Sequence, residues 1–67
     1  MPTGLHIDAV NVLQGRDDAT NFTAQLLRLI RRADERHLEM IRKVFPNAVR
    51  VYEHWFNTEE ILDLDYD

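Results

Sequence analysis

The chain has 67 residues, eight basic and twelve acidic side chains, a net charge of −4 and no cysteine. Its length allows one small domain, the missing cysteines exclude disulfide bonds, and the acidic balance argues against nucleic acid as the partner. No more than two apolar residues are consecutive, which excludes a membrane-spanning segment and predicts a cytoplasmic protein.

Charge is sorted along the sequence. Residues 51–67 carry six carboxylates and no Lys or Arg, whereas residues 19–50 hold seven basic side chains and three acidic ones. Such a separation predicts a contact between the two regions, or between each region and a partner of opposite charge.

The first residues contain apolar side chains whose spacing fits two structures. Leu5 and Ile7 alternate with polar residues, which suits a short strand. Ile7, Val10 and Leu13 recur every three residues, which suits a helical turn. We expect an extended N-terminal arm over residues 1–18.

The strongest helical pattern begins near Thr20 or Asn21, either of which can cap a helix N-terminus. Asp17 and Asp18 precede it, where negative charge is favourable for the helix dipole. Apolar residues then recur at helical spacing: Phe22, Leu26, Leu27, Ile30 and Ala33.

Two interpretations are open for the residues that follow. Asp34 can cap a second helix, which would break the first one. In a continuous helix, however, His37, Ile41 and Val44 lie on the same side as the earlier apolar residues, and no Gly or Pro intervenes. We expect one long helix over residues 21–45, with a break near Asp34 as the alternative.

Pro46 ends this helix because it lacks the N–H group that would continue the hydrogen bonding. Asn47 can cap a second helix over residues 47–57. The aromatic residues of this second helix recur at helical spacing and are expected in the core: Tyr52, Trp55 and Phe56.

The predicted fold is a small all-α domain with an N-terminal arm (residues 1–18), a helical domain (19–57) and an acidic tail (58–67). From Leu62 onward the tail alternates apolar and acidic residues, so an extended backbone places its carboxylates opposite its apolar side chains. We expect the tail to bind an apolar groove with a basic rim, on another protein or on a second copy in a homo-oligomer. The same composition also suits a mimic of nucleic-acid phosphates, or a solvated terminus. The expected partner-binding residues are Leu62, Asp63, Leu64, Asp65, Tyr66 and Asp67.

Six basic residues project from the side of the continuous helix that lies opposite its apolar stripe. They are Arg28, Arg31, Arg32, Arg36, Arg42 and Lys43. We expect this basic patch to bind an anionic partner, and the acidic tail is the nearest candidate. The alternative function is a small dimeric DNA-associated regulator that uses the same basic face.

A break at Asp34 would also give the helices the order of a helix-turn-helix. Residues 47–57 would then be the recognition helix, yet they set one cation, Arg50, against one anion, Glu53. Binding in a DNA groove normally needs several phosphate contacts, so helices packed around a shared core are the favoured interpretation.

The sequence has no enzymatic or metal-binding signature. His6, His37 and His54 are too scattered to form a metal site, and no nucleophile stands with a general base and an orienting group. We expect no cofactor, no metal, no catalytic residue and no enzymatic activity.

A pattern of mostly core residues runs from residue 20 to residue 56: Asn21-Phe22-Thr23, Leu26-Leu27, Leu29-Ile30, Ala33-Asp34, Phe45-Pro46, Val49 and Trp55. This pattern resembles small uncharacterised helical proteins encoded by actinobacteria and by the phages that infect them. The resemblance implies a phage or prophage protein, acting in the host cytoplasm by binding a host protein, and it transfers no catalytic or binding residue. The expected function is a non-enzymatic protein-interaction module.

Overall fold

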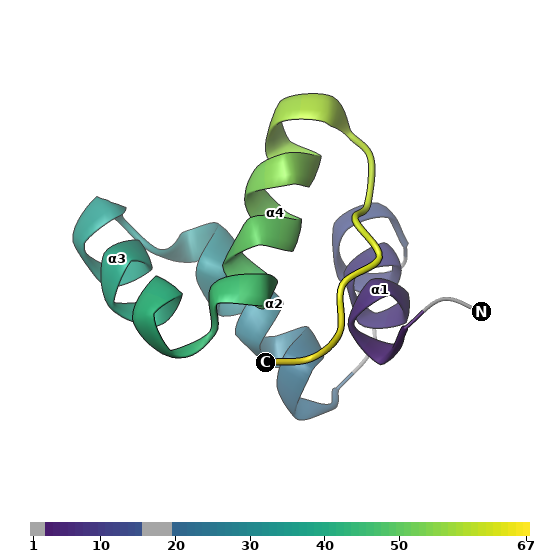
Figure 1. The fold of residues 1–67 in the computed structure, drawn as a ribbon, viewed down its shortest axis with the longest axis horizontal. Coiled ribbons are helices and arrows are strands. Elements are labelled where there is room, and N and C mark those ends of the chain that lie inside the picture. Colours follow the sequence, from purple (N-terminus) through teal and green to yellow (C-terminus); the bar gives the residue numbers. More distant parts are fainter. Residues whose placement is uncertain (1–2, 16–19) are drawn as a thin grey trace.

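The computed structural model describes residues 3–15 and 20–67, and the predicted all-α class is confirmed for them (Figure 1). Four α-helices and one π-helical segment follow one another, and the described residues contain no β-strand. Residues 59–67 have no regular structure and run back along the helices. Asp17 and Asp18 lie outside the described residues. We predicted that their charges would stabilise the dipole of the helix that begins near Asn21.

The predicted extended arm is wrong, because its described residues are helical. α1 spans Gly4–Ala9 and continues into a π-helical segment, Val10–Gln14. Thr3 is the N-cap of α1, since its side chain accepts a hydrogen bond from His6 N at 3.1 Å. The charged Asp8 hid the helical pattern in the sequence, because it belongs to the buried face. The buried side chains of this face are Leu5, Asp8, Ala9, Val12 and Leu13.

The predicted single helix over residues 21–45 is also wrong, and the alternative break near Asp34 is present. α2 spans Phe22–Arg32, and α3 spans Glu35–Val44. The Asp34 side chain accepts a hydrogen bond from His37 N at 2.8 Å, so it is the N-cap of α3. The argument from helical phase failed because the extended backbone at this junction (ψ 176° at Asp34) changes the direction of the chain.

Asn21, one of the two residues predicted to cap this helix, is the N-cap of α2. It also connects α2 to α1 through hydrogen bonds. Its Oδ1 accepts a hydrogen bond from Ala24 N at 3.3 Å, and its Nδ2 donates to both carboxylate oxygens of Asp8 at 3.0 Å. Asp8 is 6% exposed and also accepts a hydrogen bond from the Tyr66 hydroxyl at 2.6 Å. The buried carboxylate of Asp8 therefore has the hydrogen-bond partners that burial requires.

α4 spans Pro46–Thr58, close to the predicted range of 47–57. Pro46 lies in its first turn, where the missing N–H group costs no hydrogen bond. The predicted cap was wrong: the N-cap residue is Phe45 and not Asn47, and its side chain makes no capping hydrogen bond. Glu59 ends the helix in a left-handed backbone conformation (φ 62°).

The aromatic residues of α4 are divided between core and surface. Tyr52 and Trp55 pack against the core, as predicted, and their ring centroids are 6.3 Å apart. Phe56, which we also expected in the core, is 69% exposed.

The core lies between α1, α2 and α4. Leu27, Val49 and Val51 are completely buried in it. α3 contributes no buried residue and packs mainly beside α4, with Leu38 and Ile41 partly buried. Figure 1 shows α3 at one edge of the molecule, and most of its residues are exposed.

Candidate binding surfaces

The acidic tail, which we predicted to bind a partner, lies against its own chain between α1 and α4 (Figure 1). Leu62 and Leu64 are partly buried against the core, together with Ile61. Asp63 and Asp65 are exposed, so the alternation seen in the sequence is present in the burial of the side chains from Leu62 to Asp65, but it ends at Tyr66, which is 49% exposed. The apolar surface that receives the tail is formed by this chain itself.

Hydrogen bonds hold the tail against α1. Thr3 N donates to Asp63 Oδ1 at 2.9 Å, and the Thr3 hydroxyl donates to the carbonyl oxygen of Leu64 at 2.7 Å. The bonds from Thr3, above all the backbone one, favour the ionised carboxylate and lower the pKa of Asp63. The Tyr66 hydroxyl donates to the Asp8 carboxylate, and this bond raises the pKa of Tyr66.

The ring of Tyr66 lies directly over Gly4. A Cβ atom added to Gly4 would stand 2.5 Å from Tyr66 Cε2, which is much closer than two nonbonded carbon atoms approach each other. The missing side chain at position 4 is therefore what allows Tyr66 to reach Asp8.

Asp67 supplies the cap that α4 lacks. Asn47 N donates to Asp67 Oδ1 at 2.6 Å, and Ala48 N donates to Asp67 Oδ2 at 3.2 Å. The carboxylate thereby satisfies free N–H groups at the positive end of the helix dipole. The Asn47 side chain adds a bond to the carbonyl oxygen of Asp65 at 3.0 Å.

These contacts give the sorted charge a structural role. The carboxylates of Asp63 and Asp67 accept hydrogen bonds from backbone N–H groups at the starts of α1 and α4, and not from the basic patch. The acidic and basic regions do meet in an ion pair between Glu53 and Arg42, at 2.7 Å. The tail is therefore part of the fold, and its binding to another molecule stays a prediction.

The predicted basic patch does not occupy one helix face, because the break between α2 and α3 divides it. Arg31 donates to the carbonyl oxygen of Val12 at 3.2 Å, on the side of the π-helical segment. Arg42 pairs with Glu39 and Glu53. The remaining members are Arg28, which is half-buried, and the exposed Arg32, Arg36 and Lys43. Binding of an anionic partner or of DNA by these residues stays a prediction.

Four large apolar side chains of α2 and α3 are exposed to solvent. Phe22 is 68% exposed, Leu29 58%, Met40 57% and Val44 65%. Leu29 and Met40 line the same hollow of about 510 Å³ between the two helices. We call these four side chains the α2–α3 surface. Adjacent exposed apolar side chains of this size are typical of a protein interface.

A further hollow continues this surface along α2. It has a volume of about 310 Å³ and lies between Phe22 and Leu29. Phe22 also lines a pocket of about 240 Å³ at the other end of the surface. The hollows share lining residues, so together they follow the length of α2.

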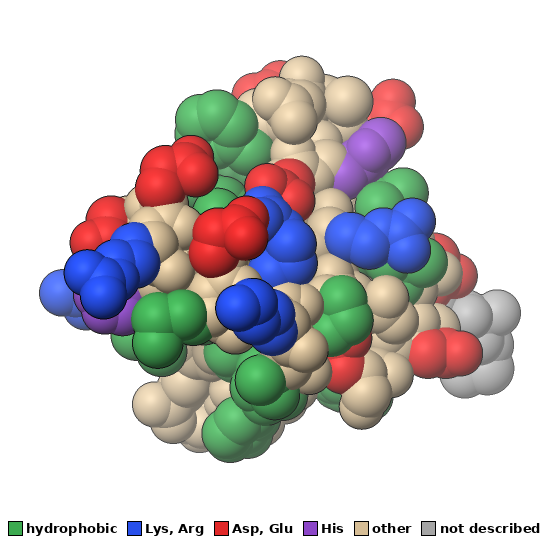
Figure 2. All heavy atoms as spheres, turned by 60° about the vertical axis from the view of Figure 1, so that its left-hand side comes forward, with side chains coloured by type: hydrophobic (Ala, Val, Ile, Leu, Met, Phe, Trp, Pro, Cys, Tyr) green, Lys and Arg blue, Asp and Glu red, His purple; other side chains and the backbone are tan. Residues whose placement is uncertain are grey.

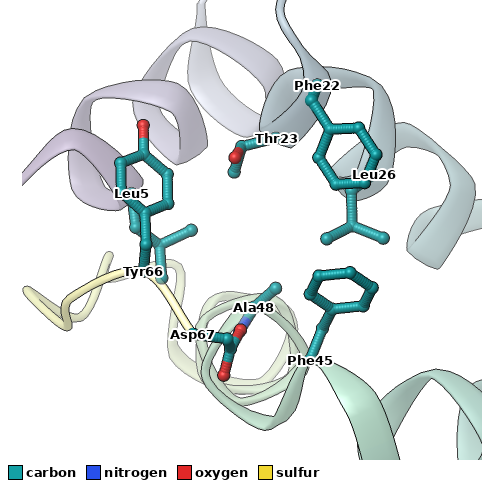
Figure 3. A pocket seen from close by; sticks show the side chains of 8 residues that line it. All are labelled: Leu5, Phe22, Thr23, Leu26, Phe45, Ala48, Tyr66 and Asp67. Carbon is teal, nitrogen blue, oxygen red and sulfur yellow. The ribbon is translucent and has the colours of Figure 1, made fainter.

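The tail lines one side of the pocket at that end (Figure 3). Leu5 and Tyr66 lie on one side of it, and Phe22, Leu26 and Phe45 lie on the other. The Phe22 and Phe45 rings are in contact, with centroids 5.9 Å apart. The tail therefore forms one end wall of the apolar path along α2.

Figure 2 turns α3 toward the viewer and shows the charge around this region. Hydrophobic side chains reach the surface on this face, and both basic (Lys, Arg) and acidic (Asp, Glu) side chains lie beside them. The α2–α3 surface thus lies in a region of mixed charge, in which the basic Arg32 lines the hollow beside Leu29 and Met40.

The sequence did not predict this surface as long as α2 and α3 were taken for one continuous helix. The prediction of a continuous helix placed Phe22 and Val44 in a single buried stripe and gave no role to Met40. The signal was present in the two caps, Asn21 and Asp34. If one helix starts after Asn21 and another after Asp34, Leu29 lies on the same face as Phe22, and Met40 lies on the same face as Val44. Each helix then has more apolar residues than its contact with the core can bury.

No metal site is formed in the part of the chain that the structure describes, because no three His, Cys, Asp or Glu side chains converge there. Asp34 Oδ1 and His37 Nδ1 do meet at 2.7 Å, but this contact belongs to the cap of α3. The hydrogen bonds from the His37 backbone and ring lower the pKa of Asp34. Among the described helices, none has the length and apolar character that crossing a membrane requires.

Comparison with known proteins gives no family. The chain matches no protein-family model, and no curated protein and no solved structure is similar enough to count as a match. The resemblance to actinobacterial and phage proteins therefore stays a prediction, and the function has to be argued from the surface itself.

Proposed function

We propose that this chain is a small, non-enzymatic protein-interaction module that binds its partner through the α2–α3 surface. The observation that supports the proposal is the exposure of Phe22, Leu29, Met40 and Val44, each more than half exposed, two of which, Leu29 and Met40, line the hollow between the two helices. An exposed apolar cluster with a polar rim is the usual composition of a protein-binding site.

The tail has a supporting role in this proposal. Ile61, Leu62 and Leu64 are packed on the core, and the Asp63, Tyr66 and Asp67 side chains are hydrogen-bonded within the chain. Binding through the tail would require these contacts to be broken first, whereas the α2–α3 surface is exposed as it stands. We therefore place the partner on α2 and α3.

Site-specific photo-crosslinking tests the proposal. A photoreactive phenylalanine analogue is placed at Met40, or at the exposed Asn57 of α4 as the control position. In an extract of the native cells, position 40 should give a defined protein adduct that position 57 does not give. Leu29→Gln should remove the adduct, because Leu29 lines the same hollow as Met40.

Two outcomes would contradict the proposal. One is the same set of adducts from both positions, which would indicate random collision. The other is an adduct from position 40 that survives the Leu29→Gln substitution. An adduct between two copies of this chain would identify the protein itself as the partner.

A further inference from the structure

We propose that the partner of the α2–α3 surface is an acidic amphipathic helix. This inference rests on the proposed function and names the class of partner that the surface recognises. Two features of the surface support this class of partner, namely its shape and the charge at its edges.

The shape fits a helix. The hollows along α2 adjoin one another, since Leu29 lines two of them and Phe22 lines two. α2 spans 11 residues, which corresponds to a length of about 16 Å or three helical turns. Apolar side chains spaced three, four and seven residues apart on a partner helix can enter such a row of hollows.

The edges of the surface are mainly basic, although the hollow between the helices is also lined by Asp34, whose carboxylate accepts a hydrogen bond from His37 N. Arg32 lies three residues after Leu29 on α2 and lines the hollow between the helices. On α3, Arg36 lies four residues before Met40 and Lys43 lies three residues after it. Residues at these spacings are neighbours on a helix surface, so both helices place positive charge beside the apolar side chains. A partner with carboxylates flanking its apolar stripe complements this arrangement.

The charge of the whole region agrees with the charge at the edges. Residues 20–45 hold six basic and three acidic side chains, a net charge of +3. Two copies that met through this surface would bring two positive regions together, which disfavours a symmetric dimer here. Nucleic acid is also a poor occupant, because phosphate groups gain nothing from the exposed Phe22, Leu29, Met40 and Val44.

A designed peptide provides the probe. It has about fourteen residues, or four helical turns, with Leu at helical spacing and Glu on both sides of the Leu stripe. A second peptide has Lys in place of every Glu, and a third has Gln in place of every Leu. Fluorescence anisotropy of the labelled peptides at about 0.15 M salt measures their affinity for the full chain.

We expect the Glu peptide to bind, and the Lys and Gln peptides to bind at least about tenfold more weakly. Leu29→Gln with Met40→Gln should weaken the Glu peptide at least about tenfold, because it removes apolar contacts at the centre of the site. Phe56→Gln is the matched control, since Phe56 is equally exposed but lies on α4, and it should leave the affinity unchanged within about twofold.

Charge reversal gives a second, independent arm. Arg36→Glu with Lys43→Glu should shift the preference of the protein toward the Lys peptide. Circular dichroism confirms that each variant keeps its helix content.

Several results would overturn the inference: absence of Glu-peptide binding, equal binding of the Glu and Lys peptides, or an unchanged preference after charge reversal. A short DNA duplex that binds more tightly than the peptide, with a steep loss of affinity on raising the salt, would assign the surface to nucleic acid instead. If the crosslink at Met40 succeeds while the Glu peptide fails to bind, the proposed function stands and only the class of partner is wrong.

Discussion

The side of the molecule formed by α1, α4 and the tail differs from the side formed by α2 and α3 in how charged and apolar side chains are placed. On the side of α1, α4 and the tail, Leu62 and Leu64 pack inward, although Phe56 is exposed, and the carboxylates of Asp63 and Asp67 accept hydrogen bonds from backbone N–H groups. On the side of α2 and α3, side chains such as Met40 face solvent beside basic residues. An acidic segment in a sequence can therefore be a folding element, while the surface that we propose for binding lies among the basic residues.

Removal of the tail should have the largest effect on stability. A chain without residues 61–67 loses the partly buried Ile61, Leu62 and Leu64 and the cap from Asp67. Each half-buried side chain contributes about 1 kcal/mol, so the free energy of unfolding should fall by at least about 3 kcal/mol. Urea unfolding followed by circular dichroism measures the loss. If the tail bound only external partners, its removal would leave the free energy of unfolding unchanged.

The contact between Gly4 and Tyr66 gives the next effect. Gly4→Ala normally favours a helix, but here the new Cβ would collide with the Tyr66 ring. We expect a destabilisation of about 1–3 kcal/mol, the usual cost of overpacking. In a Tyr66→Ala background the same substitution should become neutral or stabilising. A double-mutant cycle by urea unfolding tests this change of sign, and equal effects in both backgrounds would show that the tail is not seated on α1.

The hydroxyl of Tyr66 should make stability depend on alkaline pH. Tyr66→Phe removes the hydrogen bond to the buried Asp8 carboxylate, for an expected loss of about 1.5 kcal/mol at neutral pH. Because the folded state raises the pKa of Tyr66 above its usual 10.0, this contribution is complete below pH 10 and is lost as the pH rises through the folded-state pKa.

Unfolding curves at neutral pH and at about pH 11 measure this dependence. The difference between the original chain and the Tyr66→Phe variant should shrink at the higher pH. Tyr52→Phe is the control, and it should not reproduce this convergence. A constant difference between the two chains at both pH values would contradict the hydrogen bond.

The cap on α4 predicts a smaller effect with a close control. Asp67→Ala removes the carboxylate that accepts hydrogen bonds from Asn47 N and Ala48 N, and should cost about 1 kcal/mol. Asp65→Ala removes an equal charge from the tail, but the backbone carbonyl is what Asp65 uses to accept a hydrogen bond. Asp65→Ala should therefore change the free energy of unfolding by less than about 0.5 kcal/mol. Equal losses from both variants would indicate a general charge effect and no cap.

The opposite side of the molecule should tolerate substitution. Leu29→Gln with Met40→Gln alters exposed side chains and should change the free energy of unfolding by less than about 0.5 kcal/mol per residue. The same double variant should bind the Glu peptide at least about tenfold more weakly. A large loss of stability measured by urea unfolding would mean that these side chains belong to the fold, and it would remove the contrast between the two sides.

Local signals in the sequence predicted much of the helical structure. The capping residues Asn21 and Asp34 and the proline at position 46 mark boundaries that the structure contains. The choice of one helix over two failed because helical phase has no information about a short extended junction. The first helix was missed because its buried face includes a charged residue, Asp8, whose partners are distant in the sequence.

The position of the tail could not be predicted for the same physical reason. Thr3 and Asp63 are 60 residues apart, and their hydrogen bond depends on how α1 and α4 pack. The alternation of Leu62, Asp63, Leu64 and Asp65 did predict a segment with one apolar face and one acidic face. Alternation alone does not say whether the apolar face packs on its own chain or on another one, because the same surface chemistry serves both.

The most direct test of the division between the two sides is a chemical-shift map. The Glu peptide described above is titrated into the ¹⁵N-labelled full chain, and the backbone amide signals are followed. We predict the largest changes at residues of α2 and α3 around Leu29 and Met40, with smaller changes at Tyr66 and Asp67, which line the pocket at one end of α2, and with the amides of residues 61–65 almost unmoved. Changes concentrated in residues 61–67 would contradict this prediction, because they would show that the tail is the binding element.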